Sequence, residues 1–341
     1  YKVQDLCDKC DFEEVAYLVL HGELPGKSQL KKFTKDERSN RKLSKTIIKN
    51  IEQMPKNAHP MDVVRTCVSL MALEDKDTKD NSPKANMRKA MRIFAKTPVA
   101  LAAFYRARKG KKIISPKKKY SMSENFFHMC FGKVPNKEIV KAFDVSLILY
   151  AEHSFNVSTF TARTITSSLS DIHGAITGAI ASLKGPLHGG ANEEVMHMMN
   201  KIKKPENALK WINKALDNKD VVMGFGHRVY KSGDSRVPTM RKYFGKVSEI
   251  KKDKKFEKIY DIVEKVMIDR KNIHPNVDYP TGPTYHLMGF DTDFFTPIFV
   301  ISRITGWSAH IMEQHAANKL IRPLASYKGN KHRKVLQLNQ R

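Results

Sequence analysis

Residues 295–321 have the sequence FTPIFVISRITGWSAHIMEQHAANKLI, in which apolar side chains recur at intervals of three and four residues. Ile301, Ile304, Trp307 and Ile311 follow this interval, which places them on one face of an α-helix. The same period occurs in eight earlier segments, whereas the alternation typical of strands is nearly absent. We therefore predict an all-α protein with helices over residues 12–20, 62–73, 85–107, 137–151, 158–183, 193–202, 205–216, 252–270 and 295–321.

The composition is typical of a globular protein. Of the 341 residues, 41% are hydrophobic, which is enough for a sizeable core and excludes disordered and fibrous classes. No apolar run approaches the roughly 18 residues of a transmembrane helix. Four cysteines are too few for a disulfide framework in a chain of this length, so we expect an intracellular setting. Cys7 and Cys10 have CxxC spacing, but without a second pair they do not predict a metal site. The chain starts at Tyr1, so we expect a truncated N-terminus, and a targeting peptide ahead of it stays open.

The charge is strongly positive and unevenly distributed. Lys and Arg number 61 against 35 Asp and Glu, a formal net charge of +26. Residues 81–120 and 314–341 contain thirteen and seven of these bases and no acid. The simpler interpretation is a solvated lysine-rich surface. The alternative is a surface that binds RNA or another anionic partner with an affinity that falls as salt rises.

Three polar segments interrupt the helical pattern, and the first is GPLHGGANEE at residues 185–194. Two glycines follow His188, and Asn192 followed by acids is typical of a helix cap. The positive end of that helix would lower the pKa of His188, and a neutral imidazole can donate a hydrogen bond to a carbonyl or enolate oxygen. The alternative is a turn histidine that only caps or packs.

The second segment, MGFGHRVYKSGDSR at residues 223–236, combines His227 with Arg228, Lys231 and Arg236. Guanidinium groups bind carboxylates bidentately, and a neighbouring histidine can polarise a carbonyl, so this set suits an oxygen-rich anion. Its paired glycines alone are too weak a signal for a dinucleotide site. An ordinary basic surface loop is the alternative.

The third segment is HPNVDYPTGP at residues 274–283. Three prolines and a glycine predict a stiff loop between helices that would hold Asp278 in place as a base. The alternative is an ordinary turn aspartate.

Together these segments resemble the citrate synthase family. The resemblance runs from FEEVAYLVLHGELP at 12–25, through DNSPKANMRKA at 80–90 and LYAEHSFNVSTFTAR at 149–163, to the end of the 295–323 segment. Within the family, GFGHRVYKSGDSRVPTM and SRITGWSAHIMEQ are most similar to 2-methylcitrate synthases and bacterial-type citrate synthases. The resemblance implies a helical homodimer, with a large domain from residues 1–190 and 285–341 and a small closing domain from residues 191–284.

The resemblance also implies the reaction, which is condensation of a short acyl-CoA with oxaloacetate followed by thioester hydrolysis. Propionyl-CoA is the favoured substrate, and we expect acetyl-CoA to be used as well, because a hydrophobic site discriminates one methylene by only about 1 to 3 kcal/mol. A citrate synthase acting mainly on acetyl-CoA is the alternative. A different class of function, a silent or dual-role scaffold that binds an anionic partner, also stays open. The thioester is a substrate, and no cofactor is expected.

Site residues carry over by position. His188 resembles the family's histidine that stabilises the thioester enol, and His227 resembles the histidine that hydrogen-bonds the ketone of the 2-oxo acid. Asp278 resembles the base that removes the α-proton of the acyl-CoA. The implied oxaloacetate ligands are His153, Arg236, Arg303 and Arg322, of which Arg322 would enter the partner subunit's site. The implied CoA contacts are Val221, Val222, Met223, Gly224, Phe225 and Lys231. The implied compartment is the cytoplasm for a bacterial source and the mitochondrial matrix for a eukaryotic one.

Overall fold

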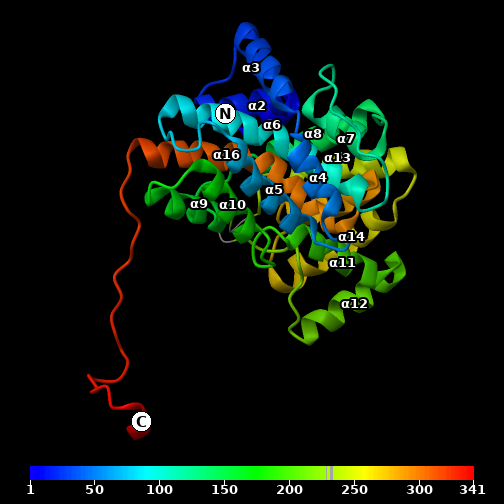
Figure 1. Cartoon of the computed structure of the whole chain (residues 1–341). Coiled ribbons are helices and arrows are strands. Elements are labelled where there is room, and N and C mark those ends of the chain that lie inside the picture. Colours follow the sequence, from blue (N-terminus) through cyan, green and yellow to red (C-terminus); the bar gives the residue numbers. More distant parts are fainter. Residues whose placement is uncertain (228, 231–232) are drawn as a thin grey trace.

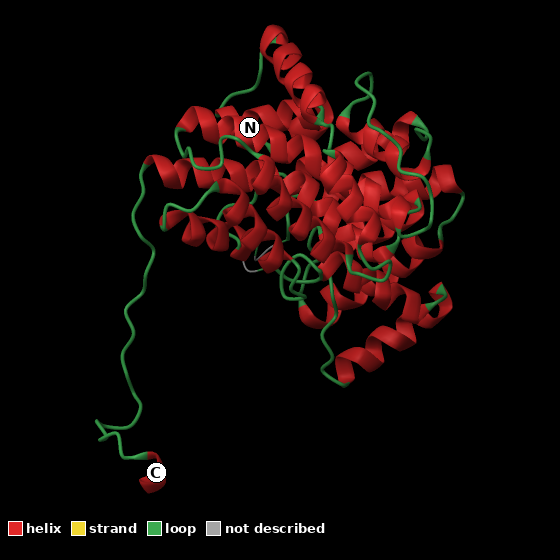
Figure 2. Cartoon of the chain, in the orientation of Figure 1, coloured by secondary structure: helices red, strands yellow, loops and turns green. Residues whose placement is uncertain are grey.

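The computed structural model describes residues 1–227, 229–230 and 233–341. Within these residues the chain forms helices and no β-strand (Figure 1, Figure 2), which confirms the all-α prediction. The α-helices are α1 (Val3–Lys9), α2 (Phe12–His21), α3 (Lys27–Asn40), α4 (Lys45–Gln53), α5 (Pro60–Glu74), α6 (Pro83–Ala107), α7 (Met122–Phe131), α8 (Lys137–Tyr150), α9 (Val157–Ser167), α10 (Ile172–Leu183), α11 (Ala191–Ile202), α12 (Pro205–Asp217), α13 (Val237–Lys251), α14 (Lys255–Lys271), α15 (Asp278–Met288) and α16 (Phe295–Ala316). Two 3-10 helices, η1 (Thr292–Phe294) and η2 (Leu338–Gln340), complete the described elements.

Seven of the nine predicted helices are confirmed with ends that differ by at most three residues. The prediction over 158–183 is wrong in one respect, because α9 and α10 are separate helices. Leu169 has a left-handed backbone, with φ of 66°. The Asp171 side chain then accepts the N–H of Gly174 at 3.0 Å and starts the new helix. The apolar period continues on both sides of this turn, so it does not reveal the break.

The prediction over 295–321 extends too far, because α16 ends at Ala316. The side chain of Asn318 donates to the carbonyl of Ser167 at 3.0 Å, and the N–H of Ile321 donates to the Ser167 hydroxyl at 3.0 Å. These contacts draw the chain along the end of α9 instead of continuing the helix. Beyond them the chain runs away from the helical body as an extended segment (Figure 1).

Helix α16 lies at the centre of the packing and contacts α2, α6, α8, α9 and α10. Its residue Gly306 donates its N–H to the carbonyl of Ala151 at 3.1 Å. A Cβ at position 306 would lie 2.6 Å from that same carbonyl oxygen, so only glycine permits this approach. The close crossing brings Arg303, one turn earlier on α16, beside the last residue of α8.

Helices α11 to α15 pack largely on one another. Here α11 packs on α15, α12 on α14 and α13 on α15, while α13 also contacts α8. Gly282 allows α15 to approach α11 closely, because a Cβ there would lie 2.7 Å from the carbonyl of Asn192. The first residue of α15 is therefore held against α11 on one side and α8 on the other.

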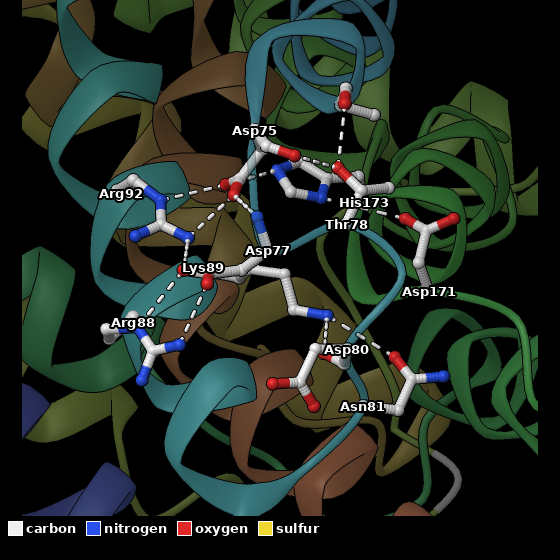
Figure 3. A network of polar contacts seen from close by, with 11 residues as sticks. Asp75, Asp77, Thr78, Asp80, Asn81, Arg88, Lys89, Arg92, Asp171 and His173 are labelled. Atoms are coloured by element: carbon white, nitrogen blue, oxygen red, sulfur yellow. Dashed lines mark hydrogen bonds and ion pairs between the residues drawn. The ribbon is translucent and has the colours of Figure 1, made fainter.

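Many bases of residues 81–120 are already neutralised by acids from other segments. Figure 3 shows Arg92 bound to Asp75 at 2.6 Å and to Asp77 at 2.6 Å, with Arg88 on Asp77 at 2.8 Å. Lys89 is fully buried and donates to the carbonyl of Asp80 at 2.5 Å. The exposed bases of this stretch are Lys84, Arg88 and Lys109 and, in its final part, Lys111, Lys112, Lys117, Lys118 and Lys119.

Candidate active site

Side chains from the three polar segments contact residues of α8, of α9 and of the turn between them, and Arg303 of α16 contacts the end of α8. The ring of His153, which follows α8, lies 5.1 Å from the ring of His227. Arg303 on α16 donates through Nε to the carbonyl of Tyr150 at 2.7 Å, and the Tyr150 hydroxyl donates to Asp278 Oδ1 at 2.5 Å. Residues far apart in the chain therefore form a continuous set of polar contacts.

His188 is held by the start of α9. The N–H of Ser158 donates to His188 Nε2 at 3.3 Å, and the Ser158 hydroxyl lies 2.8 Å from the same atom. A backbone N–H can only donate, so Nε2 accepts and Nδ1 carries the proton. Burial, together with the charge of Arg303, lowers the pKa of His188 to about 4. The imidazole is neutral at pH 7 and can donate from Nδ1.

The expected cap before α11 is wrong in detail. Asn192 lies inside the first turn, fully buried, and Gly190 occupies the N-cap position. The Asn192 side-chain oxygen accepts from the Thr296 hydroxyl at 3.3 Å, so this side chain ties α11 to α16 instead of capping its own helix. The low pKa of His188 therefore arises first from burial, not from the helix dipole on which the sequence argument relied.

Asp278 is the first residue of α15 and not part of a loop, which corrects the prediction. Its N–H donates to Asn276 Oδ1 at 3.1 Å, which fixes the chain entering the helix. Proline is tolerated in the first turn because the N–H groups there have no partner within the helix, so Pro280 does not prevent helix formation. Burial raises the pKa of the Asp278 carboxyl to about 6, against the opposing effects of Tyr150, Arg236 and Arg303.

Arg236 and Arg303 supply the positive charge of the pocket. Arg236 binds Asp234 through two nearly parallel hydrogen bonds of 2.9 and 2.7 Å. Arg303 has only the Tyr150 carbonyl as a hydrogen-bond partner among the described residues. Burial and the charge of Arg236 lower the pKa of Arg303 to about 9. Only Arg236 of this pair is hydrogen-bonded to a carboxylate among the described residues, so the guanidinium of Arg303 can bind an anionic ligand.

His227 and His153 are also neutral at pH 7. The N–H of Val229 donates to His227 Nδ1 at 3.1 Å, so the proton of His227 lies on Nε2. Burial and Arg236 lower its pKa. His153 Nε2 contacts the hydroxyl of Tyr230 at 3.0 Å, and burial with Arg236 and Arg303 lowers its pKa to about 4. Both rings can therefore serve as uncharged hydrogen-bonding groups.

The second and third polar segments are joined by backbone hydrogen bonds. The N–H of Gly226 donates to the backbone carbonyl of His274 at 2.8 Å, and the N–H of Asn276 donates to the backbone carbonyl of Gly224 at 2.9 Å. Gly224 has φ of 85°, and a Cβ there would lie 2.6 Å from the Val195 side chain. A cavity of about 250 Å³ opens beside this pairing, lined in part by His227, Tyr230, Asp234 and His274.

Not every predicted residue joins this cluster. Val221 is 83% exposed at the edge, whereas Val222 is buried and Met223 and Phe225 are partly buried. Lys231 and Arg228 lie outside the described residues. Arg322 is exposed and lies beyond the end of α16 at Ala316. Sequence reasoning missed Tyr150 and Asp234, and only their positions next to predicted residues could have indicated them.

The described residues contain no group of three or more His, Cys, Asp or Glu side chains placed to hold a metal ion. All four cysteines are buried free thiols. Among the helices of the described ranges, none has the length and apolar composition needed to cross a lipid bilayer.

Comparison with known proteins finds related sequences and structures over nearly the whole chain. The family model for the citrate synthase C-terminal domain matches residues 1–324. The 2-methylcitrate synthase of Mycobacterium tuberculosis is 50% identical over 333 residues, covering 98% of this chain and 84% of that protein. The citrate synthase of Mycolicibacterium smegmatis is 49% identical over 336 residues, covering 98% and 89%. Citrate synthase of Thermoplasma acidophilum, solved with carboxymethyl coenzyme A and oxaloacetate, superposes with a TM-score of 0.94 at 33% identity, covering 100% and 92%.

The pairing of Asp234 with Arg236 leads to a stability prediction. In Asp234→Asn, Arg236 stays buried without its carboxylate, so we expect the free energy of unfolding at pH 7 to fall by about 3 kcal/mol or more. Asp261→Asn removes the exposed carboxylate partner of Arg241 and should cost about 1 kcal/mol or less. Urea titration of both variants against the parent measures these differences.

The same pair predicts a pH dependence. Burial opposes ionisation of Asp234, but hydrogen bonds from Arg236 outweigh it and lower its pKa below the usual value. Its stabilising contribution is therefore present at neutral pH and is lost as pH falls through the folded-state pKa. The stabilities of Asp234→Asn and the parent should converge in acid. A difference that stays constant between pH 7 and pH 3 would contradict this account.

Proposed function

The chain belongs to the citrate synthase family, and on that premise we propose that the clustered residues condense a short acyl-CoA with oxaloacetate and then hydrolyse the thioester. The products are 2-methylcitrate or citrate, with free CoA. The observation that carries the proposal is the arrangement of one carboxyl of raised pKa and three neutral histidines around two buried arginines.

In the proposed mechanism Asp278 removes a proton from the α-carbon of the thioester. A carboxylate is a very weak base for this proton, so the developing enolate needs a positioned donor, and His188 Nδ1–H serves this purpose. Because the imidazole is neutral beforehand, its hydrogen bond strengthens as negative charge develops on the oxygen. The pKa of Asp278, raised to about 6, makes its carboxylate more basic than an exposed aspartate while leaving it ionised at pH 7.

The enol then attacks the ketone carbon of oxaloacetate. His227 Nε2–H donates to the ketone oxygen, where negative charge develops as the carbon–carbon bond forms. The carboxylates of oxaloacetate are bound by Arg236, Arg303 and His153. One of them gives Arg303 a carboxylate partner, which it lacks among the described hydrogen bonds. Water finally cleaves the thioester and releases CoA.

Propionyl-CoA is the proposed preferred substrate, with acetyl-CoA as a second substrate. One methylene changes binding in a hydrophobic site by about 1 to 3 kcal/mol, so exclusive use of either is not expected. The proposal draws support from a sequence identity of 50% to a 2-methylcitrate synthase. Because the identity to a citrate synthase is 49%, a preference for acetyl-CoA is the alternative.

The proposed assembly is a homodimer in which Arg322 of each chain enters the partner's pocket, and the exposure of this arginine beyond the end of α16 supports it. Residues 191–284 form the proposed closing domain over residues 1–190 and 285–341. The segment Val221–Phe225 with Lys231 is the proposed CoA contact, and no cofactor is required. The proposed compartment is the cytoplasm for a bacterial source and the mitochondrial matrix for a eukaryotic one.

The scaffold function remains a separate candidate, favoured by the exposed lysines at 111–119 and the seven bases of 314–341. Binding to an RNA homopolymer that weakens steeply between about 50 and 200 mM salt would support it. No binding near 150 mM salt would leave the net charge as a feature of the solvated surface.

The proposed function is tested by release of free CoA with oxaloacetate present, on acetyl-CoA and propionyl-CoA in parallel. We expect turnover on both and a higher kcat/KM on propionyl-CoA. In Asp278→Asn we expect kcat to fall about 100-fold or more, because an amide cannot accept the α-proton. Asp269→Asn, at an exposed position of α14, is the matched control and should retain full turnover.

The pH profile adds a second readout. Burial raises the pKa of Asp278 to about 6, and only its ionised form is a base, so kcat/KM should rise with pH through about 6 and level off above it. Turnover retained in Asp278→Asn would show that another group is the base. No CoA release by the parent with either thioester would overturn the enzyme assignment.

The proposed role of Arg322 is tested by mixing two impaired variants. In a heterodimer of Asp278→Asn and Arg322→Ala chains, the pocket of the second chain has its own Asp278 and the partner's intact arginine. Random assortment of equal amounts should therefore restore about a quarter of the parent activity. No recovery after subunit exchange would mean that Arg322 serves its own chain or neither.

A further inference from the structure

Tyr150, the last residue of α8, joins two parts of the site that come from different helices. Its side chain is fully buried, and its hydroxyl donates to Asp278 Oδ1 at 2.5 Å. Its backbone carbonyl accepts from Arg303 Nε at 2.7 Å. One residue therefore contacts the proposed base through its side chain and a proposed oxaloacetate ligand through its backbone.

The orientation of Tyr150 is fixed by packing. Its ring lies 4.0 Å from the ring of Phe299, with an angle of 34° between the two planes. The guanidinium of Arg303 lies 4.6 Å from the same Phe299 ring. Gly306 holds α16 against the residue that follows Tyr150, through its hydrogen bond to Ala151. The hydroxyl thus has little freedom to leave Asp278, since the ring cannot rotate without displacing Phe299.

We propose that Tyr150 is a positioning residue for the condensation: its hydroxyl holds Oδ1 of Asp278 so that Oδ2 is the atom that receives the substrate proton. This inference rests on the proposed function. Oδ2 accepts no hydrogen bond from any described residue, so it is the oxygen left for the substrate. As the α-carbon C–H bond breaks, its electron pair enters the enolate and the proton moves to Oδ2.

The chemistry of the hydroxyl suits this role. Burial, with the nearby Asp278 charge, raises the pKa of Tyr150 well above its usual value, so the phenol keeps its proton and can donate it in the hydrogen bond to Asp278. A donor to the ionised carboxyl favours that ionised form. Tyr150 therefore opposes the effect of burial on Asp278 and keeps the base ionised at neutral pH.

Other charged and titratable groups near Asp278 act on it as well. Arg236 and Arg303 lower its pKa, while Asp234 raises it. Tyr285, further along α15, keeps its proton because burial raises its pKa above the usual value, and its hydroxyl lies 2.8 Å from the Ser146 hydroxyl. Tyr285 is a buried tyrosine on the same helix as Asp278, and its hydroxyl contacts Ser146 instead of the Asp278 carboxyl. It is therefore a matched control for Tyr150.

The test compares Tyr150→Phe with Tyr285→Phe. In Tyr150→Phe we expect kcat to fall roughly 10- to 100-fold, because the Asp278 carboxylate loses one hydrogen bond. The acid limb of kcat/KM should move to higher pH by about one pH unit, because the ionised carboxyl loses its donor. KM for oxaloacetate should change less than about threefold, because the backbone carbonyl that holds Arg303 is retained. Tyr285→Phe should show neither the loss in kcat nor the shift of the acid limb.

Two further measurements keep the inference testable whatever the outcome for activity. A ¹³C-aspartate NMR titration, assigned with Asp278→Asn, reads the carboxyl directly and separates failure of this inference from failure of the proposed function. Incorporation of 3,5-difluorotyrosine at position 150 preserves the shape and strengthens the donor, so the Asp278 titration should move to lower pH. An Asp278 titration that is the same in the parent, in Tyr150→Phe and in the fluorinated protein would overturn the inference.

Discussion

The site depends on one constraint, the burial of two guanidinium groups of which only Arg236 is hydrogen-bonded to a carboxylate among the described residues. Asp234 pairs with Arg236, whereas Arg303 is bound by a carbonyl only, among the described residues. The unbalanced positive charge, added to burial, keeps the neighbouring histidines neutral. The same positive charge favours binding of a small dianion, whose carboxylates would pair with the guanidinium of Arg303.

The same constraint explains how one carboxyl can serve as the base. Burial raises the pKa of Asp278, and without compensation the group would be protonated at neutral pH. Arg236, Arg303 and the hydroxyl of Tyr150 act in the opposite direction, so the pKa stays at about 6. The close approach of α16 to the end of α8 at Gly306 brings two of these groups, Tyr150 and Arg303, together. Packing and proton chemistry are therefore linked through a single helix crossing.

Much of this organisation could be predicted from the sequence, and the exceptions have physical reasons. Helical periodicity located seven helices closely, but it does not register the turn before Asp171, where the apolar pattern continues across a break. Prolines suggested a loop around Asp278, although proline is also compatible with a first helical turn. His188 and His227 stood out because glycines and bases surround them. Tyr150 did not, since within the apolar run of α8 it is indistinguishable from a core residue.

The most direct test of this electrostatic account is an NMR titration of the histidine imidazoles in the protein without substrate, with assignments from His153→Gln and His188→Gln. The account predicts that both rings titrate near pH 4, well below an exposed histidine at about 6.5. Saturating oxaloacetate should raise the pKa of His153, because the dianion offsets the two arginines. Titration of both rings near pH 6.5 and no response to oxaloacetate would contradict the account.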